Sequence, residues 1–264
     1  MQAEIGIIGG TGLQDPRLFK NLQEITVDTP YGAPSDAFTV GEMAGRPVAF
    51  LPRHGRKHTI RPTDVNSRAN IFAFKKLGVE RILAVSTVGS LKEAYMPGDI
   101  AFVDQFIDRT TRREQSFYAE HQVCHISVAE PMCPEIRKTL IAVAKAAKIK
   151  AHGTATYVCI EGPRFSTKAE SKLFQAWGAD VVGMTLVPEC VLAREAEICY
   201  ASISAVTDYD CWKDHPVSAE EIVTTMRTNI EKVKQIIAET VAKLPKERGA
   251  AGCECKSALK CALL

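Results

Sequence analysis

The sequence Glu4-Ile-Gly-Ile-Ile-Gly-Gly-Thr-Gly-Leu13 opens with a short apolar run that stops at a glycine-rich turn. Residues 5–8 are typical of a buried strand, and glycines at a strand end let the backbone approach a ligand closely. Successive backbone N–H groups in such a turn can bind an anion, and Thr11 adds a hydroxyl donor. The stretch predicts a strand followed either by an oxyanion-binding loop or by a plain tight turn.

Neither common nucleotide-phosphate motif is present. Counting G-x-G-x-x-G from Gly10 reaches Asp15 where a third glycine is needed, and no G-x-x-x-x-G-K-[ST] occurs. No obvious carboxylate cluster suits the Mg²⁺ that accompanies a nucleoside triphosphate. A small free oxyanion therefore fits the sequence better than a triphosphate.

Composition is that of an ordinary globular chain. The 264 residues are 46% hydrophobic and 24% charged, and a chain of this length buries roughly three quarters of its unfolded surface. The formal net charge of +2 is too small to favour nucleic acid or a membrane as partner. No run approaches the ~18 apolar residues of a membrane helix, and no secretory signal is visible. We expect a cytoplasmic protein.

Strand and helix patterns alternate along the chain. The predicted strands are 5–8, 39–43, 47–51, 82–85, 99–107, 156–160, 180–184 and 199–206. The predicted helices cover about 66–77, 134–148, 167–178, 188–196 and 218–244. This alternation predicts an α/β fold in which one central, mixed but largely parallel sheet is flanked by helices. We expect one domain over residues 1–245 and a polar tail over residues 246–264.

Polar or aromatic side chains follow five of the predicted strands. They are Thr11, the pair Ser86 and Thr87, Phe165, Thr185, and the pair Asp208 and Asp210. In open α/β sheets ligands bind outside the carboxyl ends of the strands. The five strand ends therefore predict one shared ligand site.

A basic loop supplies the charge for an anion. Arg53 can bind phosphate with bidentate geometry, and the neighbouring His54 can add a charge-assisted donor. The hydroxyl groups that follow the strands would complete an oxyanion site. The alternative is a solvated surface loop.

Asp208 and Asp210 are two positions apart, so on an extended segment both side chains point the same way. Neighbouring acids raise one another's pKa, and one can stay protonated near neutral pH. Such a pair can bind a ring nitrogen and an exocyclic amine, with Phe165 stacking on a heterocycle. The alternatives are an Asx-type turn and a core phenylalanine.

Nine cysteines are many for a cytoplasmic chain. His121, Cys124 and His125 lie close together in sequence, but no second ligand pair completes a tetrahedral zinc site, so we expect no metal. Buried thiols account for most of the cysteines. Cys253 and Cys255, on a tail that we expect to be exposed, suggest a disulfide of the kind found in heat-loving organisms.

Taken together and in order, the motifs over residues 4–244 resemble those of the methylthioadenosine phosphorylases, in the trimeric branch of the purine nucleoside phosphorylases. The matching segments are Ile7-Ile-Gly-Gly-Thr-Gly12, Pro30-Tyr-Gly-Ala-Pro-Ser-Asp36, Arg53-His-Gly-Arg56, Gln105-Phe-Ile-Asp-Arg-Thr110, Ile160-Glu-Gly-Pro-Arg-Phe-Ser166, Gly183-Met-Thr185 and Thr207-Asp-Tyr-Asp-Cys-Trp212.

The resemblance implies a nucleoside phosphorylase domain over residues 1–245 and a reaction. Methylthioadenosine and phosphate would give adenine and 5-methylthioribose 1-phosphate, with inorganic phosphate as co-substrate and no cofactor. Phosphate would be held by Thr11, Arg53, His54, Ser86, Thr87 and Thr185. The catalytic residues would be Asp208, His54 and Ser86.

The resemblance also assigns the nucleoside contacts. Met184 would lie along the ribose, Phe165 would face the purine, and Asp208 and Asp210 would bind N7 and the 6-amino group. His125 of a neighbouring subunit would cover the 5′ end. The methylthio group would be enclosed by Val217, Ala219 and Ile222.

Two acids at the base suit a 6-amino purine, whereas oxopurine phosphorylases of this fold typically present an asparagine there. Adenosine and other purine nucleosides remain additional substrates. The alternatives are a broad-specificity purine nucleoside phosphorylase and, in a different class, a non-catalytic nucleotide-binding module.

The tail resembles the C-x-C ending of thermophilic archaeal relatives. That resemblance implies the disulfides Cys253–Cys255 and Cys133–Cys199, the latter a pair that those relatives bridge. It also implies a homo-trimer or a hexamer built as a dimer of trimers.

Overall fold

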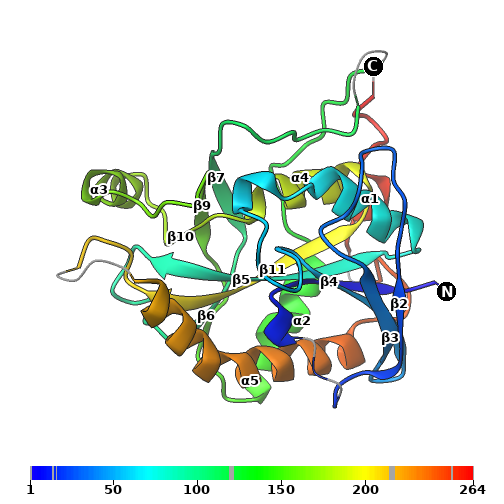
Figure 1. Ribbon diagram of the computed structural model, residues 1–264, viewed down its shortest axis with the longest axis horizontal. Helices are drawn as coiled ribbons and strands as arrows, with labels where there is room; N and C mark the ends of the chain where they lie inside the picture. Colours follow the sequence, from blue (N-terminus) through cyan, green and yellow to red (C-terminus); the bar gives the residue numbers. More distant parts are fainter. Residues whose placement is uncertain are drawn as a thin grey trace.

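One mixed sheet runs through the molecule (Figure 1). The computed structural model describes residues 2–13, 15, 17–118, 122–213, 218–250 and 252–263. Its strands are β1 (Ile5–Gly9), β2 (Lys20–Ile25), β3 (Phe38–Met43), β4 (Arg46–Pro52), β5 (Arg81–Ser90), β6 (Ile100–Phe102), β7 (Gln105–Arg109), β8 (Ala151–His152), β9 (Thr156–Ile160), β10 (Val181–Gly183) and β11 (Cys199–Asp208). Its α-helices are α1 (Ser67–Lys76), α2 (Pro134–Ala146), α3 (Lys168–Ala176), α4 (Leu186–Glu195) and α5 (Ala219–Lys243).

The strands follow the order β2-β3-β4-β1-β5-β10-β9-β7, and β11, β6 and β8 extend the sheet from β5. Six of the ten pairings among the described strands are parallel, which confirms the predicted mixed, largely parallel sheet. Strand β5 is central, because β11 pairs along one edge while β1 and β10 pair with successive parts of the other.

Helices cover both faces of the sheet. Figure 1 shows α1 and α4 on one side and α2 and α5 on the other. Each side has its own buried apolar cluster, one centred on residues such as Phe74 and Leu192, the other on residues such as Phe102 and Ile236. The sheet is therefore buried between two helical layers, as parallel sheets are.

Local signals place the helix ends where the sequence predicts them. The Asn66 side chain accepts a hydrogen bond from the Ala69 N–H at the start of α1. Thr167 and Glu170 form a reciprocal capping box at the start of α3. Gly78 and Gly178 follow α1 and α3 with positive φ, a conformation that glycine adopts without strain.

Four strand predictions differ from the structure, and one of them concerns the two-residue strand β8, which was not predicted. Strand β5 continues to Ser90, past the predicted end at residue 85, because β11 and β10 supply pairing partners for its polar residues. The predicted strand 99–107 is divided into β6 and β7, which pair with different neighbours. Strand β2 was not predicted, since it is a mostly exposed edge strand without an apolar face.

The C-terminal segment packs onto the domain. Cys253 and Cys255 are buried in the cluster beneath α2 and α5, so the expected exposed position of these thiols is wrong. Leu263 forms a β-bridge with Cys124, and the His125 N–H donates to the Ala262 carbonyl at 2.7 Å. The tail therefore holds the segment around residues 124–125.

Neither expected disulfide, Cys133–Cys199 or Cys253–Cys255, is formed. All nine cysteines are free thiols. None of the described helices has both the length and the apolar character needed to cross a lipid bilayer.

Candidate active site

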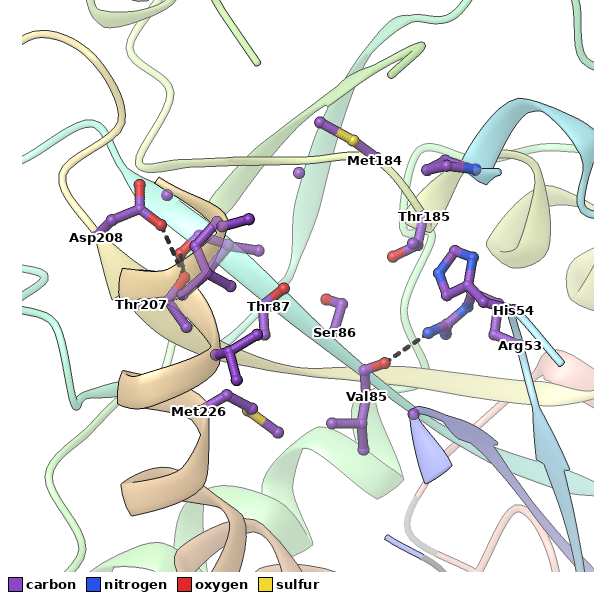
Figure 2. A pocket seen from close by; sticks show the side chains of 18 of the residues that line it. Arg53, His54, Val85, Ser86, Thr87, Met184, Thr185, Thr207, Asp208 and Met226 are labelled. Atoms are coloured by element: carbon purple, nitrogen blue, oxygen red, sulfur yellow. Dashed lines mark hydrogen bonds between the residues drawn. The ribbon is translucent and has the colours of Figure 1, made fainter. Parts of the chain in front are cut away.

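A cavity of about 770 Å³ lies at the carboxyl ends of β1, β4, β5, β10 and β11 and is closed on one side by the first half of α5. Figure 2 shows its two chemically different ends: Arg53 and His54 stand at one end, and Asp208 with Thr207 stands at the other. Ser86 and Thr87 of β5 lie between them. A cationic end and an acidic end thus face one space.

Eleven of the residues expected at a ligand site line this cavity. They are Arg53, His54, Ser86, Thr87, Phe165, Met184, Thr185, Asp208, Asp210, Ala219 and Ile222. The Thr11 side chain and Val217 lie outside the described part of the chain, although Gly10 and Gly12 beside Thr11 do line the cavity. His125 does not belong to the lining of its own chain's cavity.

Glu189 of α4 holds the Arg53 guanidinium. Nε and Nη2 donate to the two Glu189 carboxylate oxygens at 2.5 and 3.0 Å, and Nη1 donates to the Val85 carbonyl at 2.7 Å. Burial disfavours the charged guanidinium, but the attraction and hydrogen bonds of Glu189 outweigh it and raise the pKa of Arg53. The Tyr200 hydroxyl donates to the same carboxylate at 2.9 Å. Arg53 is a fixed positive charge, with one further N–H on each of Nη1 and Nη2.

His54 is neutral at physiological pH. Burial and then repulsion by Arg53 lower its pKa to about 4. Its Nδ1 lies 2.9 Å from the Ile60 carbonyl, an acceptor, so the proton of the neutral ring sits on Nδ1. The prediction that His54 is a charged hydrogen-bond donor is therefore wrong. The neutral ring presents Nε2 as a hydrogen-bond acceptor.

Hydroxyl groups surround the middle of the cavity. Ser86 and Thr87 belong to β5, and the Ser86 hydroxyl lies 3.4 Å from that of Ser204 on the neighbouring strand. Thr185 precedes α4, and its side chain makes no capping hydrogen bond to that helix. Hydroxyls can donate to phosphate or to ribose oxygens.

Asp208 and Asp210 form the acidic end. The Asp208 carboxyl accepts from the Thr207 hydroxyl and from the Asp210 N–H, each at 2.8 Å, which fixes its orientation. Burial raises the pKa of Asp210.

Gly89 makes room for the acidic pair. A Cβ at this position would lie 2.8 Å from the Asp208 Oδ1 and 3.2 Å from the Asp210 Cβ. Real Cβ atoms do not approach an oxygen this closely, so any larger residue would displace Asp208. The strand that carries Ser86 and Thr87 thus also shapes the opposite end of the cavity.

The loop around Met184 is held by Arg113, a residue that the sequence did not single out. Its Nη1 donates to the carbonyls of Met184 and Val187 at 2.7 and 2.5 Å. Glu161 pairs with the same guanidinium; although burial opposes it, hydrogen bonds from Thr63, Thr111 and Arg113 lower the pKa of Glu161 to about 2.

Gly162 explains the glycine of the Ile160–Ser166 motif. A Cβ there would lie 2.5 Å from the Met184 sulfur, so only glycine lets the methionine lie in its observed place. Gly162 also has a φ of +69°, which favours glycine.

Apolar side chains complete the wall. Phe165 is 40% exposed at the cavity, and Val223, Met226 and Ile230 continue the surface that Ile222 begins on α5. These three were missed, because apolar residues at helical spacing are typical of core packing. Among the described residues, the one group of three or more side chains that could ligate a metal, Cys133 with Cys199, Cys253 and Cys255, lies outside this cavity.

Comparisons with known proteins identify the family of this chain. The model of the Phosphorylase superfamily matches residues 4–242. An S-methyl-5'-thioadenosine phosphorylase of Nitrosopumilus maritimus is 55% identical over 257 residues, 97% of each chain.

Solved structures give the same result. A methylthioadenosine phosphorylase from an antarctic soil metagenomic library superposes with a TM-score of 0.93 at 43% identity and covers 100% of this chain and 93% of its own. A Schistosoma mansoni methylthioadenosine phosphorylase in complex with adenine has a TM-score of 0.91 at 39% identity, covering 98% and 96%. This chain belongs to the phosphorylase superfamily and, within it, to the S-methyl-5'-thioadenosine phosphorylase family.

Proposed function

We propose that this protein is a pentosyltransferase that cleaves 5′-methylthioadenosine with inorganic phosphate, giving adenine and 5-methylthioribose 1-phosphate. The observation that carries the proposal is the pairing of a buried cation with an acid pair across one cavity (Figure 2). Related structures hold adenine or methylthioadenosine. Methionine and purine salvage follow from these products.

Phosphate binds at the cationic end. Arg53 supplies the charge, the Thr11, Ser86, Thr87 and Thr185 hydroxyls donate to phosphate oxygens, and the neutral His54 accepts from a P–OH group. Glu189 offsets the charge of Arg53 but holds the guanidinium so that one N–H on each of Nη1 and Nη2 can donate to the phosphate.

The purine binds at the acidic end. Asp208 and Asp210 contact N7 and the 6-amino group, and Phe165 faces the ring. As the C1′–N9 bond breaks, the ribose becomes positive and the purine negative. The bound phosphate stabilises and then attacks C1′, while the proton of the acid pair moves to the purine. Ser86 positions the attacking phosphate.

The 5′ end lies against α5. Ala219, Ile222 and the newly identified Val223 and Met226 offer an apolar surface for the methylthio group. The sequence assigns Val217 to the same role. Adenosine and other purine nucleosides are additional substrates, because this uncharged surface does not repel a 5′-hydroxyl group in place of the methylthio group.

A homo-trimer, alone or paired into a hexamer, supports the role of His125. This residue is exposed and lines no part of its own chain's cavity. It can cover the 5′ end only of a neighbouring subunit's substrate. Multi-angle light scattering at assay concentration tests this: a monomer with full activity contradicts it.

The test of function is adenine release from methylthioadenosine with and without phosphate. Release only with phosphate supports the phosphorylase. Release without phosphate indicates a hydrolase, and tight binding without release indicates a nucleotide-binding module. Parallel rates with adenosine and inosine separate a methylthioadenosine enzyme from a broad-specificity phosphorylase.

A further inference from the structure

Four cysteine sulfurs from distant parts of the chain meet in the core. Cys133, Cys199, Cys253 and Cys255 are all buried, and their sulfur atoms lie within 4.8 Å of one another. Cys133 is the N-cap residue of α2, Cys199 begins β11, and the other two come from the C-terminal segment. The cluster therefore joins three separate elements.

The sulfurs are arranged as a group rather than as two pairs. The Cys253 sulfur lies 3.5 Å from that of Cys133 and 3.4 Å from that of Cys199. A tetrahedral zinc site with Zn–S bonds of about 2.3 Å has sulfur–sulfur edges of about 3.8 Å. Small movements of the side chains would therefore bring the four sulfurs to the corners of such a tetrahedron.

The surroundings stabilise negative charge on the sulfurs. The Arg194 guanidinium Nη1 lies 3.5 Å from the Cys255 sulfur. The Cys255 N–H donates to the Cys253 sulfur at 3.4 Å. Cys133 also stands at the N-terminus of α2, the positive end of a helix of 13 residues. Hydrogen bonds and nearby positive charge are typical of metal-bound thiolates.

We propose that these four cysteines bind one zinc ion, or another soft divalent cation of similar size, in a closed tetrahedral site. Binding displaces four thiol protons and gives a centre with a net charge of −2, which Arg194 and the helix end partly offset. Four protein ligands leave no open coordination position, so the site is structural and not catalytic.

The site fastens the C-terminal segment to the sheet. Beyond Cys255, the tail reaches Ala262 and Leu263, which bond to the backbone at His125 and Cys124. Figure 1 shows this last part of the chain beside the long connection that precedes α2. The metal would therefore stabilise the surface that presents His125, independently of any reaction in the cavity.

Metal analysis of the full-length protein, purified without an affinity metal and in the presence of a phosphine reductant, tests the proposal. We expect about one zinc per chain by mass spectrometry and nine titratable thiols after denaturation with a chelator. Protein that contains no zinc and binds none when Zn²⁺ is added would overturn it. Five thiols and no metal in protein purified without reductant, with no zinc uptake after reduction, would show that two disulfides are the working state.

Two variants locate the site. Cys255→Ser should lose the zinc, whereas Cys261→Ser, an exposed thiol of the same tail, should keep it. Reconstitution of the wild-type apoprotein with Co²⁺ should give the intense visible absorption of tetrahedral cobalt thiolate, and the Cys255→Ser protein should not. Equal zinc content in both variants, or an octahedral cobalt spectrum, would contradict the assignment whatever the enzymatic activity.

Discussion

Replacing Asp208 by asparagine tests how the acidic end recognises the base. The Asp208 carboxyl is 5% exposed and accepts from the Thr207 hydroxyl and the Asp210 N–H. Asparagine can keep its oxygen toward the Asp210 N–H and donate its amide to the Thr207 hydroxyl, which rotates to accept. The fold should therefore lose only about 1 kcal/mol of stability.

Catalysis should suffer far more than stability. The Asp208→Asn side chain cannot give a proton to the leaving purine, and general acid catalysis contributes roughly 10²- to 10⁴-fold. For methylthioadenosine we expect kcat/KM to fall by about 10²- to 10³-fold, or about 3–4 kcal/mol of transition-state stabilisation. In a 6-oxo purine both N7 and the 6-oxygen can accept hydrogen bonds from the asparagine amide, which replaces part of the lost proton donation, so inosine should lose much less.

The assay compares kcat/KM for methylthioadenosine and inosine in wild-type and variant enzyme, with a thermal melt of each. Asp64→Asn, at an exposed acid that forms an ion pair with Arg61 at the surface, is the matched control. This control should leave kcat/KM unchanged for both methylthioadenosine and inosine. Equal losses on both nucleosides in Asp208→Asn, or a large fall in melting temperature, would refute this account of base recognition.

Two further perturbations follow from the same cavity. His54 has a pKa of about 4 instead of 6.5, so the unfolded chain binds the extra proton between these values and wild-type stability falls by up to about 3 kcal/mol as pH drops from 6.5 to 4. The His54→Asn variant, whose amide can still donate to the Ile60 carbonyl, should lose about 3 kcal/mol less of its free energy of unfolding over the same pH range, measured by chemical denaturation. An equal loss in wild type and variant would contradict the lowered pKa of His54. Gly89→Ala should displace Asp208 and raise KM for methylthioadenosine at least tenfold with little effect on KM for phosphate, measured by steady-state kinetics; equal changes in both would show a general distortion.

The sequence predicted the residues at strand ends well, because a parallel sheet brings its carboxyl edges together whatever the loop lengths. Thr185, Asp208 and Arg53 meet for this reason. Ser86 and Thr87 reach the cavity from inside β5 rather than from a loop after it. The strand was predicted to end before them because their side chains are polar, but the backbone hydrogen bonds of β5 continue beyond them.

The supporting residues could not be predicted in the same way. Glu189 lies 136 positions from the Arg53 that it holds, and Arg113 reaches the carbonyl of Met184 from a long polar connection. Neither partner has a local pattern that marks it. The four clustered cysteines are hidden likewise, since one close pair and two single residues do not form a recognisable zinc motif.

Strand β11 links the metal cluster to the reaction site. It is buried along its whole length, begins at Cys199 and ends at Asp208, about 30 Å away. β5 pairs with the strand from Cys199 to Asp208, with one register shift between Val206 and Asp208, and β6 pairs with Ile203–Ala205. This ladder separates a disturbance near Cys199 from Asp208. Loss of the cysteine cluster should therefore lower the melting temperature and loosen the tail, while kcat for bound substrate stays close to that of the intact enzyme. A fall in kcat equal to that of Asp208→Asn would show instead that the two ends of the strand are coupled.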